Sequence, residues 1–235
     1  MRYHSPDRLK KKGKQMTQIK LCGIKKLSTI RLINTLDVDA VGFIQVLKSP
    51  RYLDPDQTFH LRKSLADHLA AVGVFLNQDL DEVSRLAISC GFDIIQLHGQ
   101  EDQTYIDQLK ERINRPIIKA CPIRQLKDLD QAKNYKVDYL LLDAPLAGSG
   151  KSFDWSLLKD FNQDYFLAGG LTKDNVSSAI KKLNPYGVDV SSGIERMKEK
   201  DPDLIRQFVA NVRQADQNLY SLEAKEFPPL EGEAV

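Results

Sequence analysis

The stretch Ala168-Gly169-Gly170-Leu171 ends one short apolar run of this chain, and Asp189-Val190-Ser191-Ser192-Gly193 ends the next. Six similar runs come before them. The runs that we expect to be strands are Gln18–Cys22, Ala40–Ile44, Ala71–Leu76, Ile94–Leu97, Ile117–Ala120, Tyr139–Asp143, Tyr165–Ala168 and Gly187–Val190. They are apolar nearly throughout, which is typical of parallel strands covered on both faces. Amphipathic segments lie between them, and the clearest of these predicts a helix that begins at Asp201-Pro202.

The position of the glycine-bearing turns distinguishes two layouts for these strand-and-helix units. An open doubly wound sheet usually has a glycine-rich phosphate turn after its first strand, and Cys22-Gly23-Ile24-Lys25 lacks that pattern. The glycine-bearing turns follow the sixth, seventh and eighth predicted strands instead. We therefore predict an α/β protein with a single-domain (β/α)8 TIM barrel.

Composition narrows the class of protein. The 235 residues are 42% hydrophobic with a net charge of +2, so they can form one sizeable core and give no case for nucleic-acid or membrane binding. Cys22, Cys90 and Cys121 show no metal-ligand or disulfide spacing, and no apolar run is long enough to span a membrane. We expect a cytoplasmic protein without a metal site.

Both ends differ in composition from the middle of the chain. Residues 1–17 are basic and poorly apolar, so we expect a flexible arm, followed by the barrel at 18–217 and a C-terminal tail at 218–235. Lys10–Gln15 can be encoded almost wholly by purines, as a ribosome-binding site would be. We therefore hypothesise that translation starts at Met16.

The turns after the seventh and eighth strands predict a phosphate site. In (β/α)8 barrels these two loops commonly bind phosphate through backbone N–H groups, helped by a short helix N-terminus. Gly169 and Gly170 allow close approach of the backbone, and Ser191 and Ser192 add hydroxyl donors. Either turn alone could be an ordinary tight turn, but together they favour phosphate binding.

Two ionisable residues end apolar strands at what would be one mouth of the barrel. Cys22 could supply a thiolate base there, but the residues alone slightly favour a small buried cysteine, since free cysteine is among the most buried residue types. Asp143 ends Leu140-Leu141-Leu142, where desolvation would suit a general acid. Arg51, soon after the second strand, is either a carboxylate-binding fork or a surface arginine.

The remaining candidates give weaker signals. His98 closes the fourth strand, where it would either touch substrate or be a hydrogen-bonded structural residue. Gly148–Ser152 resembles the end of a P-loop but has Pro145 where the first glycine is needed, so we expect a flexible loop over the mouth. Trp155 is expected to be a packing anchor. Glu195, Lys200 and Asp201 are expected to be solvated charges.

Taken in order, the motifs of this chain resemble those of the phosphoribosylanthranilate isomerases. The matching strings are Lys20-Leu21-Cys22-Gly23-Ile24, Val41-Gly42-Phe43, Ser49-Pro50-Arg51-Tyr52, Val72-Gly73-Val74-Phe75, Gln96-Leu97-His98-Gly99, Leu141-Leu142-Asp143, Gly148-Ser149-Gly150-Lys151 with Phe153-Asp154-Trp155, Ala168-Gly169-Gly170-Leu171 and Val188-Asp189-Val190-Ser191-Ser192-Gly193-Ile194-Glu195. They extend over nearly all of the predicted folded part.

The resemblance implies an enzyme of tryptophan biosynthesis without a cofactor, which carries out the Amadori rearrangement of N-(5-phosphoribosyl)anthranilate. By the same resemblance Cys22 is the general base, Asp143 the general acid, and Arg51 the residue that holds the anthranilate carboxylate. The substrate phosphate would lie on Gly169, Gly170, Ser192 and Gly193. We add Asp189 and His98 to the substrate-binding candidates, and expect a monomer or a homodimer.

The chain departs from the family at Gln45, where an apolar residue is usual, and at Lys198, where glycine is common. Other phosphate-binding barrels fit less well. The histidine-pathway sugar isomerase has an aspartate where Cys22 stands, and indole-glycerol-phosphate synthase needs charged residues where Leu97 and Ala120 close strands. A catalytically silent barrel that binds a phosphorylated ligand would not need the pair Cys22 and Asp143.

Overall fold

Eight parallel strands form a closed barrel in this protein. A computed structural model describes residues 16–144 and 154–226. The strands follow one another around the barrel in chain order, and the last pairs with the first. They are β1 (Gln18–Cys22), β2 (Ala40–Ile44), β3 (Ala70–Phe75), β4 (Ile94–Leu97), β5 (Ile117–Pro122), β6 (Tyr139–Asp143), β7 (Tyr165–Leu167) and β8 (Gly187–Val190). The predicted (β/α)8 fold is confirmed, and only β3, β5 and β7 differ from their predicted bounds, by one or two residues at an end.

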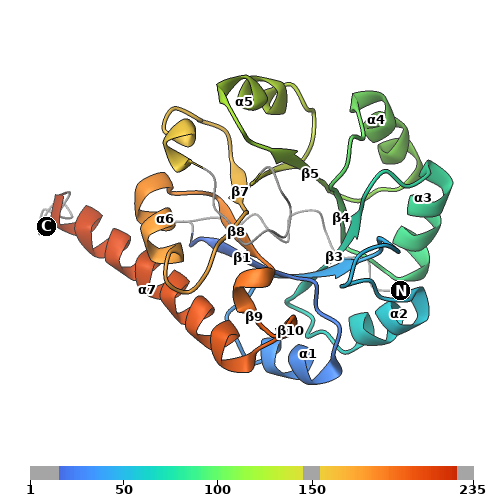
Figure 1. Cartoon of the computed structure of the whole chain (residues 1–235), viewed down its shortest axis with the longest axis horizontal. Coiled ribbons are helices and arrows are strands. Elements are labelled where there is room, and N and C mark those ends of the chain that lie inside the picture. The colour runs from blue at the N-terminus through green and yellow to red at the C-terminus, as the bar shows by residue number, and fades with distance from the viewer. Residues whose placement is uncertain (1–15, 145–153, 227–235) are drawn as a thin grey trace, which may run out of the picture.

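Helices surround the barrel (Figure 1). They are α1 (Leu27–Ile33), α2 (Pro55–Lys63), α3 (Leu80–Ser89), α4 (Gln103–Arg112), α5 (Leu126–Lys133), α6 (Val176–Leu183) and α7 (Pro202–Glu226), with short 3₁₀ helices η2 (Trp155–Leu158) and η3 (Ser192–Ile194). Carboxylate caps set several of the starts: Asp54, Asp79 and Asp102 each accept a hydrogen bond from a backbone N–H in the first turn of α2, α3 and α4. After η3 the chain forms a small antiparallel hairpin, β9 (Glu195–Arg196) with β10 (Glu199–Lys200).

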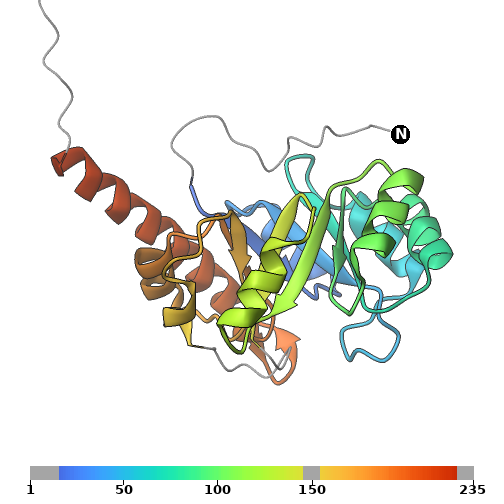
Figure 2. The ribbon, with the colours of Figure 1, turned by 90° about the horizontal axis from the view of Figure 1, so that it is seen from above.

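The last helix begins where the sequence predicts and ends later. Asp201 Oδ1 accepts hydrogen bonds from the backbone N–H groups of Asp203 and Leu204, which caps α7. The helix continues past residue 217 to Glu226 and projects beyond the barrel (Figure 2), so the first part of the expected tail is helical. Its Leu, Ala, Glu and Lys residues are good helix formers, which accounts for this extension. Residues 227–235 lie outside the described part.

The N-terminal entry to the barrel is fastened to α7. Thr17, which the sequence placed in the flexible arm, is buried, and its Oγ1 donates a hydrogen bond of 2.6 Å to Asp216 Oδ1. Arg213 Nη1 also donates to the Thr17 carbonyl oxygen at 2.7 Å. The fold therefore includes Thr17, whereas residues 1–15, the rest of the expected arm, lie outside the described residues.

Two apolar layers result from the alternation of side chains along the strands. The larger lies between the strands and the surrounding helices, and includes Ile19 and Leu21 of β1. The smaller fills the barrel and includes Cys22, Val72, Ile118, Leu141 and Phe166. Trp155 packs against the outer layer as expected. Because side chains alternate in a strand, Lys20 shares the inward face of Cys22.

Within residues 16–144 and 154–226, no helix is long and apolar enough to cross a membrane. The same residues hold no group of three or more His, Cys, Asp or Glu side chains that could bind a metal ion. Cys22, Cys90 and Cys121 are free thiols, and all three are buried.

Candidate active site

A pocket of about 280 Å³ opens at the carboxyl ends of the barrel strands. Predicted site residues lie close together there although they are far apart in the sequence. Those that line the pocket are Cys22, Arg51, His98, Asp143, Gly169, Gly170, Asp189 and Ser192. Gly193, the remaining candidate, does not line it. The pocket also has apolar walls, including Ile44, Val46 and Val74. A ligand with both apolar and anionic parts suits this lining.

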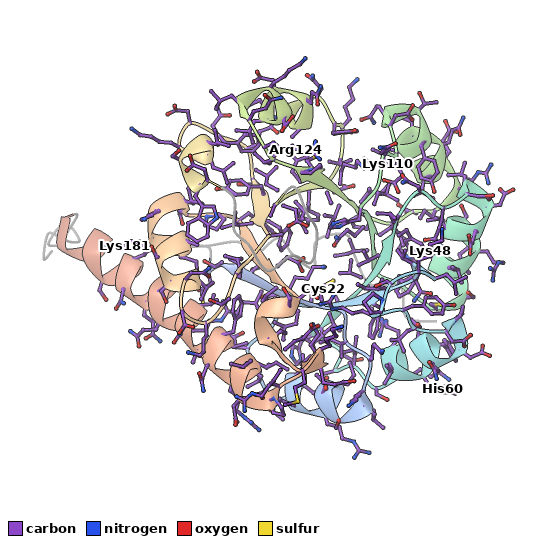
Figure 3. The ribbon with its side chains drawn as sticks, in the orientation of Figure 1. Cys22, Lys48, His60, Lys110, Arg124 and Lys181 are labelled. Carbon is purple, nitrogen blue, oxygen red and sulfur yellow. The ribbon has the colours of Figure 1, made fainter. Side chains whose placement is uncertain are left out.

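Cys22 ends β1 with its side chain inside the barrel. Figure 3 shows it near the middle of the ring, whereas Lys181 and His60 lie on the outer helices. The residue is only 5% exposed, as expected of a small buried cysteine, and it also lines the pocket. Gly42 on the neighbouring strand makes room for it, since a Cβ there would lie 2.7 Å from Cys22 Sγ. Burial raises the pKa of the Cys22 thiol, and the lysines at 20 and 200 offset only part of this effect.

Lys20, two residues before Cys22, is a buried cation beneath the pocket. It was not among the site residues expected from the sequence. Its side chain is 0% exposed, and Nζ lies 2.7 Å from Asp189 Oδ1. Burial alone would lower the pKa of Lys20, but Asp189 and the Cys22 thiol raise it above its ordinary value. The Lys20 ammonium and the Cys22 thiol both lie close to Gly42, where a Cβ would be 3.2 Å from Lys20 Nζ. The inward position of Lys20 in an apolar strand was the signal that could have revealed it.

Asp143 ends β6 on the rim of the pocket. Its Oδ1 accepts a 2.7 Å hydrogen bond from the N–H of Ala144, and its Oδ2 lies 3.3 Å from His98 Nε2. His98 Nδ1 in turn lies 2.9 Å from Gln96 Nε2. His98 is therefore both hydrogen-bonded and part of the pocket lining.

The two glycine-bearing turns lie next to the acid. Gly169 and Gly170 have φ angles of +83° and +67°, which favour glycine. A Cβ on Gly169 would lie 2.4 Å from the backbone nitrogen of Ala144, so the turn after β7 packs directly against the end of β6. Gly193 instead packs the two turns together, because its Cβ would come within 1.8 Å of the Leu171 carbonyl oxygen. Gly193 therefore packs the turn after β8 against the turn after β7 and does not line the pocket.

Arg51 and the hairpin after β8 form a buried charge network. Arg51 Nε and Nη2 each donate a 2.7 Å hydrogen bond to Glu195, one to each carboxylate oxygen. Lys200 Nζ donates to Glu195 Oε1 at 2.8 Å. The side chains of Glu195 and Lys200 are 7% and 6% exposed, so the expectation that they are solvated charges is wrong. The short β9–β10 hairpin folds Glu195 and Lys200 back under the rim, and this tertiary contact has no local sequence signal. Asp201, in contrast, caps α7.

Comparison with known proteins gives the family. The family model for N-(5′-phosphoribosyl)anthranilate isomerase matches residues 19–211. The chain belongs to this family. A relative of that name from Endomicrobium trichonymphae is 41% identical over 202 residues, which are 84% of this chain and 99% of the relative. The relative from Clostridium acetobutylicum is 40% identical, over 84% of this chain and 98% of its own length. The family and the class of enzyme that the motifs implied are confirmed.

Solved structures of the family have the same barrel. The isomerase from Thermotoga maritima superposes with a TM-score of 0.79 at 34% identity, over 85% of this chain and 100% of that chain. A family structure in complex with reduced 1-(o-carboxyphenylamino)-1-deoxyribulose 5-phosphate has a TM-score of 0.77, also at 34% identity, and covers 85% of this chain and 100% of that one. The pocket of this chain thus occurs in a fold that, in that relative, holds a phosphorylated, carboxylated ligand.

Proposed function

We propose that this isomerase converts N-(5-phosphoribosyl)anthranilate into 1-(2-carboxyphenylamino)-1-deoxyribulose 5-phosphate in tryptophan biosynthesis, with Asp143 as general acid and Cys22 as general base. The observation that carries the assignment is the convergence of Cys22, Asp143 and Arg51 on one pocket with the glycine turn at 169–170. The pocket thus combines a proton donor, a proton acceptor, a carboxylate-binding cation and a phosphate site.

The first step is ring opening. Asp143 gives its proton to the furanose ring oxygen, the bond between C1 and that oxygen breaks, and the nitrogen lone pair forms an iminium at C1. Asp143 Oδ1 is held by the Ala144 amide. This leaves Oδ2, beside His98, for proton transfer.

The second step is proton transfer at carbon. The iminium acidifies the proton on C2, and the Cys22 thiolate removes it to give an enolamine. Burial disfavours the thiolate, so the positive charges of the iminium and of the lysines at 20 and 200 are needed to favour it. Cys22 then returns the proton to C1, while the C2 hydroxyl gives its proton to the Asp143 carboxylate. The product is the ketone, and both side chains regain their starting states.

Binding of the substrate uses the two ends of the pocket. The phosphate lies on the backbone N–H groups of Gly169, Gly170 and Ser192, with Gly193 holding the turns together. Arg51 binds the anthranilate carboxylate, and Asp189 accepts a hydrogen bond from a sugar hydroxyl. We also propose that the protein works in the cytoplasm without a cofactor, as a monomer or homodimer; one family structure is of monomers made from the dimeric Thermotoga maritima isomerase.

Loss of substrate fluorescence tests this proposal. Anthranilate, phosphoribosyl pyrophosphate and the transferase that joins them supply the fluorescent substrate, and addition of this protein should consume it. Cys22→Ser and Asp143→Asn should each reduce kcat by at least about 100-fold, the contribution typical of one acid or base group. Both variants should still bind the reduced product. Undiminished kcat in either variant would contradict the assigned roles, and no turnover by the wild type would point to a silent phosphate-binding barrel.

A further inference from the structure

Arg51 uses only part of its hydrogen-bonding capacity in the network described above. A guanidinium has five N–H donors. Glu195 occupies Nε and one hydrogen of Nη2, the side-on fork. Among the residues that the structure describes, no hydrogen bond or ion pair uses Arg51 Nη1. One hydrogen of Nη1 and the second hydrogen of Nη2 form another fork at the end of the side chain, which suits a second carboxylate.

The exposure of the three charged side chains shows which of them a ligand can reach. Arg51 is 21% exposed, whereas Glu195 is 7% and Lys200 is 6% exposed. Arg51 lines the pocket, and neither of the other two does. Its stem packs over Gly23, where a Cβ would lie 2.7 Å from Arg51 Cδ. The arginine is thus held by Glu195 on one side and along its stem, and its Nη1 group has no hydrogen-bond partner among the described residues.

Lys200 connects this arm with the rest of the site. Besides Glu195, Nζ donates to the Ser191 carbonyl oxygen at 2.8 Å and lies 3.3 Å from Ser191 Oγ. Ser191 Oγ in turn donates to the carbonyl oxygen of Cys22 at 3.2 Å. One buried ammonium therefore joins the carboxylate-binding arm, the start of the phosphate turn and the backbone of the proposed base.

We propose that Glu195 and Lys200 are positioning residues for the substrate carboxylate: Glu195 holds Arg51 side-on so that the end of its guanidinium receives the carboxylate, and Lys200 sets this arm relative to the turn after β8. The pair touches no reacting atom. This inference rests on the proposed function, and it adds that the distance between carboxylate and phosphate recognition is set by the β9–β10 hairpin.

Two ligands that differ only in the carboxyl group test this role. One is the reduced product, and the other is its phenylamino counterpart, which lacks the carboxyl group. Isothermal titration calorimetry on Glu195→Gln should show about tenfold weaker binding of the first ligand, because a charge-assisted fork is misplaced, and less than about twofold change for the second. In turnover, KM should rise by about the same factor while kcat stays within about twofold.

Matched variants separate positioning from folding and charge. Glu199→Gln makes the same charge change on the same hairpin at a side chain that is 56% exposed and pairs with Lys26, so it should leave both affinities unchanged. If Glu195→Gln unfolds, Glu195→Gln with Lys200→Met removes the buried pair together and should show the same ligand dependence.

The opposite outcomes are equally specific. Equal weakening of both ligands would mean that Glu195 only supports the fold, and unchanged or tighter binding of the carboxylated ligand would mean that Glu195 competes with it for Arg51. Either result overturns the proposal. The comparison of ligands does not depend on turnover, so an inactive wild type would refute the proposed function separately.

Discussion

Replacing Asp189 with asparagine should destabilise this protein through Lys20, a residue that the substitution does not touch. In the structure Lys20 Nζ lies 2.7 Å from Asp189 Oδ1. Asparagine keeps an oxygen that can accept a hydrogen bond from Lys20 Nζ, but it removes the negative charge. The ammonium of Lys20 is 0% exposed and sits inside the barrel, so water cannot replace the lost partner. Besides Asp189, the described group that acts on the charge of Lys20 is the Cys22 thiol, and burial disfavours its ionisation.

The expected loss follows from the cost of an unpaired buried charge. Breaking a buried ion pair by removing one partner costs about 3–5 kcal/mol. The lower end applies here, because the Asp189 side chain is 10% exposed and the asparagine retains an acceptor. A loss of about 3 kcal/mol corresponds to a fall in Tm of about 6–12 °C for a domain of this size.

The dependence on pH distinguishes this cause from a packing defect. In the wild type the pKa of Lys20 is raised, so its stabilising contribution is complete below the unfolded pKa and is lost as pH rises through the folded pKa. In the variant, burial without a counter-charge should lower the pKa of Lys20. The unfolded state then binds the proton more tightly, and stability recovers as pH rises toward the unfolded pKa. The gap between the two proteins should therefore narrow between pH 7 and about pH 10.

Urea unfolding at several pH values measures this gap, with Lys20→Met/Asp189→Asn as the matched control. The double variant no longer contains the buried ammonium and should recover most of the lost stability. The reasoning is refuted if Asp189→Asn lies within about 0.5 kcal/mol of the wild type, the usual range of a surface change. It is also refuted if the gap stays constant with pH, or if the double variant is no more stable than the single one.

Two further predictions concern the reactivity of Cys22 and the shape of the phosphate turns. Burial raises the pKa of Cys22 and Lys20 lowers it. Alkylation by iodoacetamide at pH 8, measured by peptide mass spectrometry, should therefore be slower at Cys22 than at a free thiol, and slower again in Lys20→Met. Faster labelling of Cys22 in the variant would contradict this reasoning. Gly193→Ala should weaken the inhibition of turnover by inorganic phosphate by at least about tenfold. The Cβ of the new alanine would come within 1.8 Å of the Leu171 carbonyl oxygen, so the turns after β7 and β8 would have to separate. Unchanged inhibition would show that the phosphate site lies elsewhere, and Ser178→Ala on α6 serves as the control.

Continuous apolar runs made the strands predictable. Parallel strands covered on both faces are short apolar runs, and β1, β2, β4, β6 and β8 have the predicted bounds. The ends of strands were less certain, because an end depends on the neighbouring strand: β5 extends to Pro122 by pairing with Asp143 of β6. The end of α7 was placed too early, although residues 217–226 contain neither the glycine nor the proline that would end a helix.

Site residues were predictable where an ionisable side chain stands at the end of an apolar strand. Cys22 and Asp143 end apolar runs, and in a closed parallel barrel such ends meet at one mouth. Arg51 was ambiguous in the sequence because its partner, Glu195, lies far along the chain and is joined to it only by the hairpin after β8. The ordered motifs then placed the chain in its family, which the comparisons confirm.

The barrel, the family and the residues at the strand ends follow from the sequence alone, because they depend on local patterns of apolar, glycine and ionisable residues. The electrostatics of the site come from the tertiary fold. Lys20, Glu195 and Lys200 look like ordinary charges in the sequence, yet the closed barrel and the hairpin bury all three. Burial and pairing of a charge depend on tertiary contacts: closure of β1 against β8 places Lys20 beside Asp189, and the β9–β10 hairpin places Glu195 and Lys200 beside Arg51.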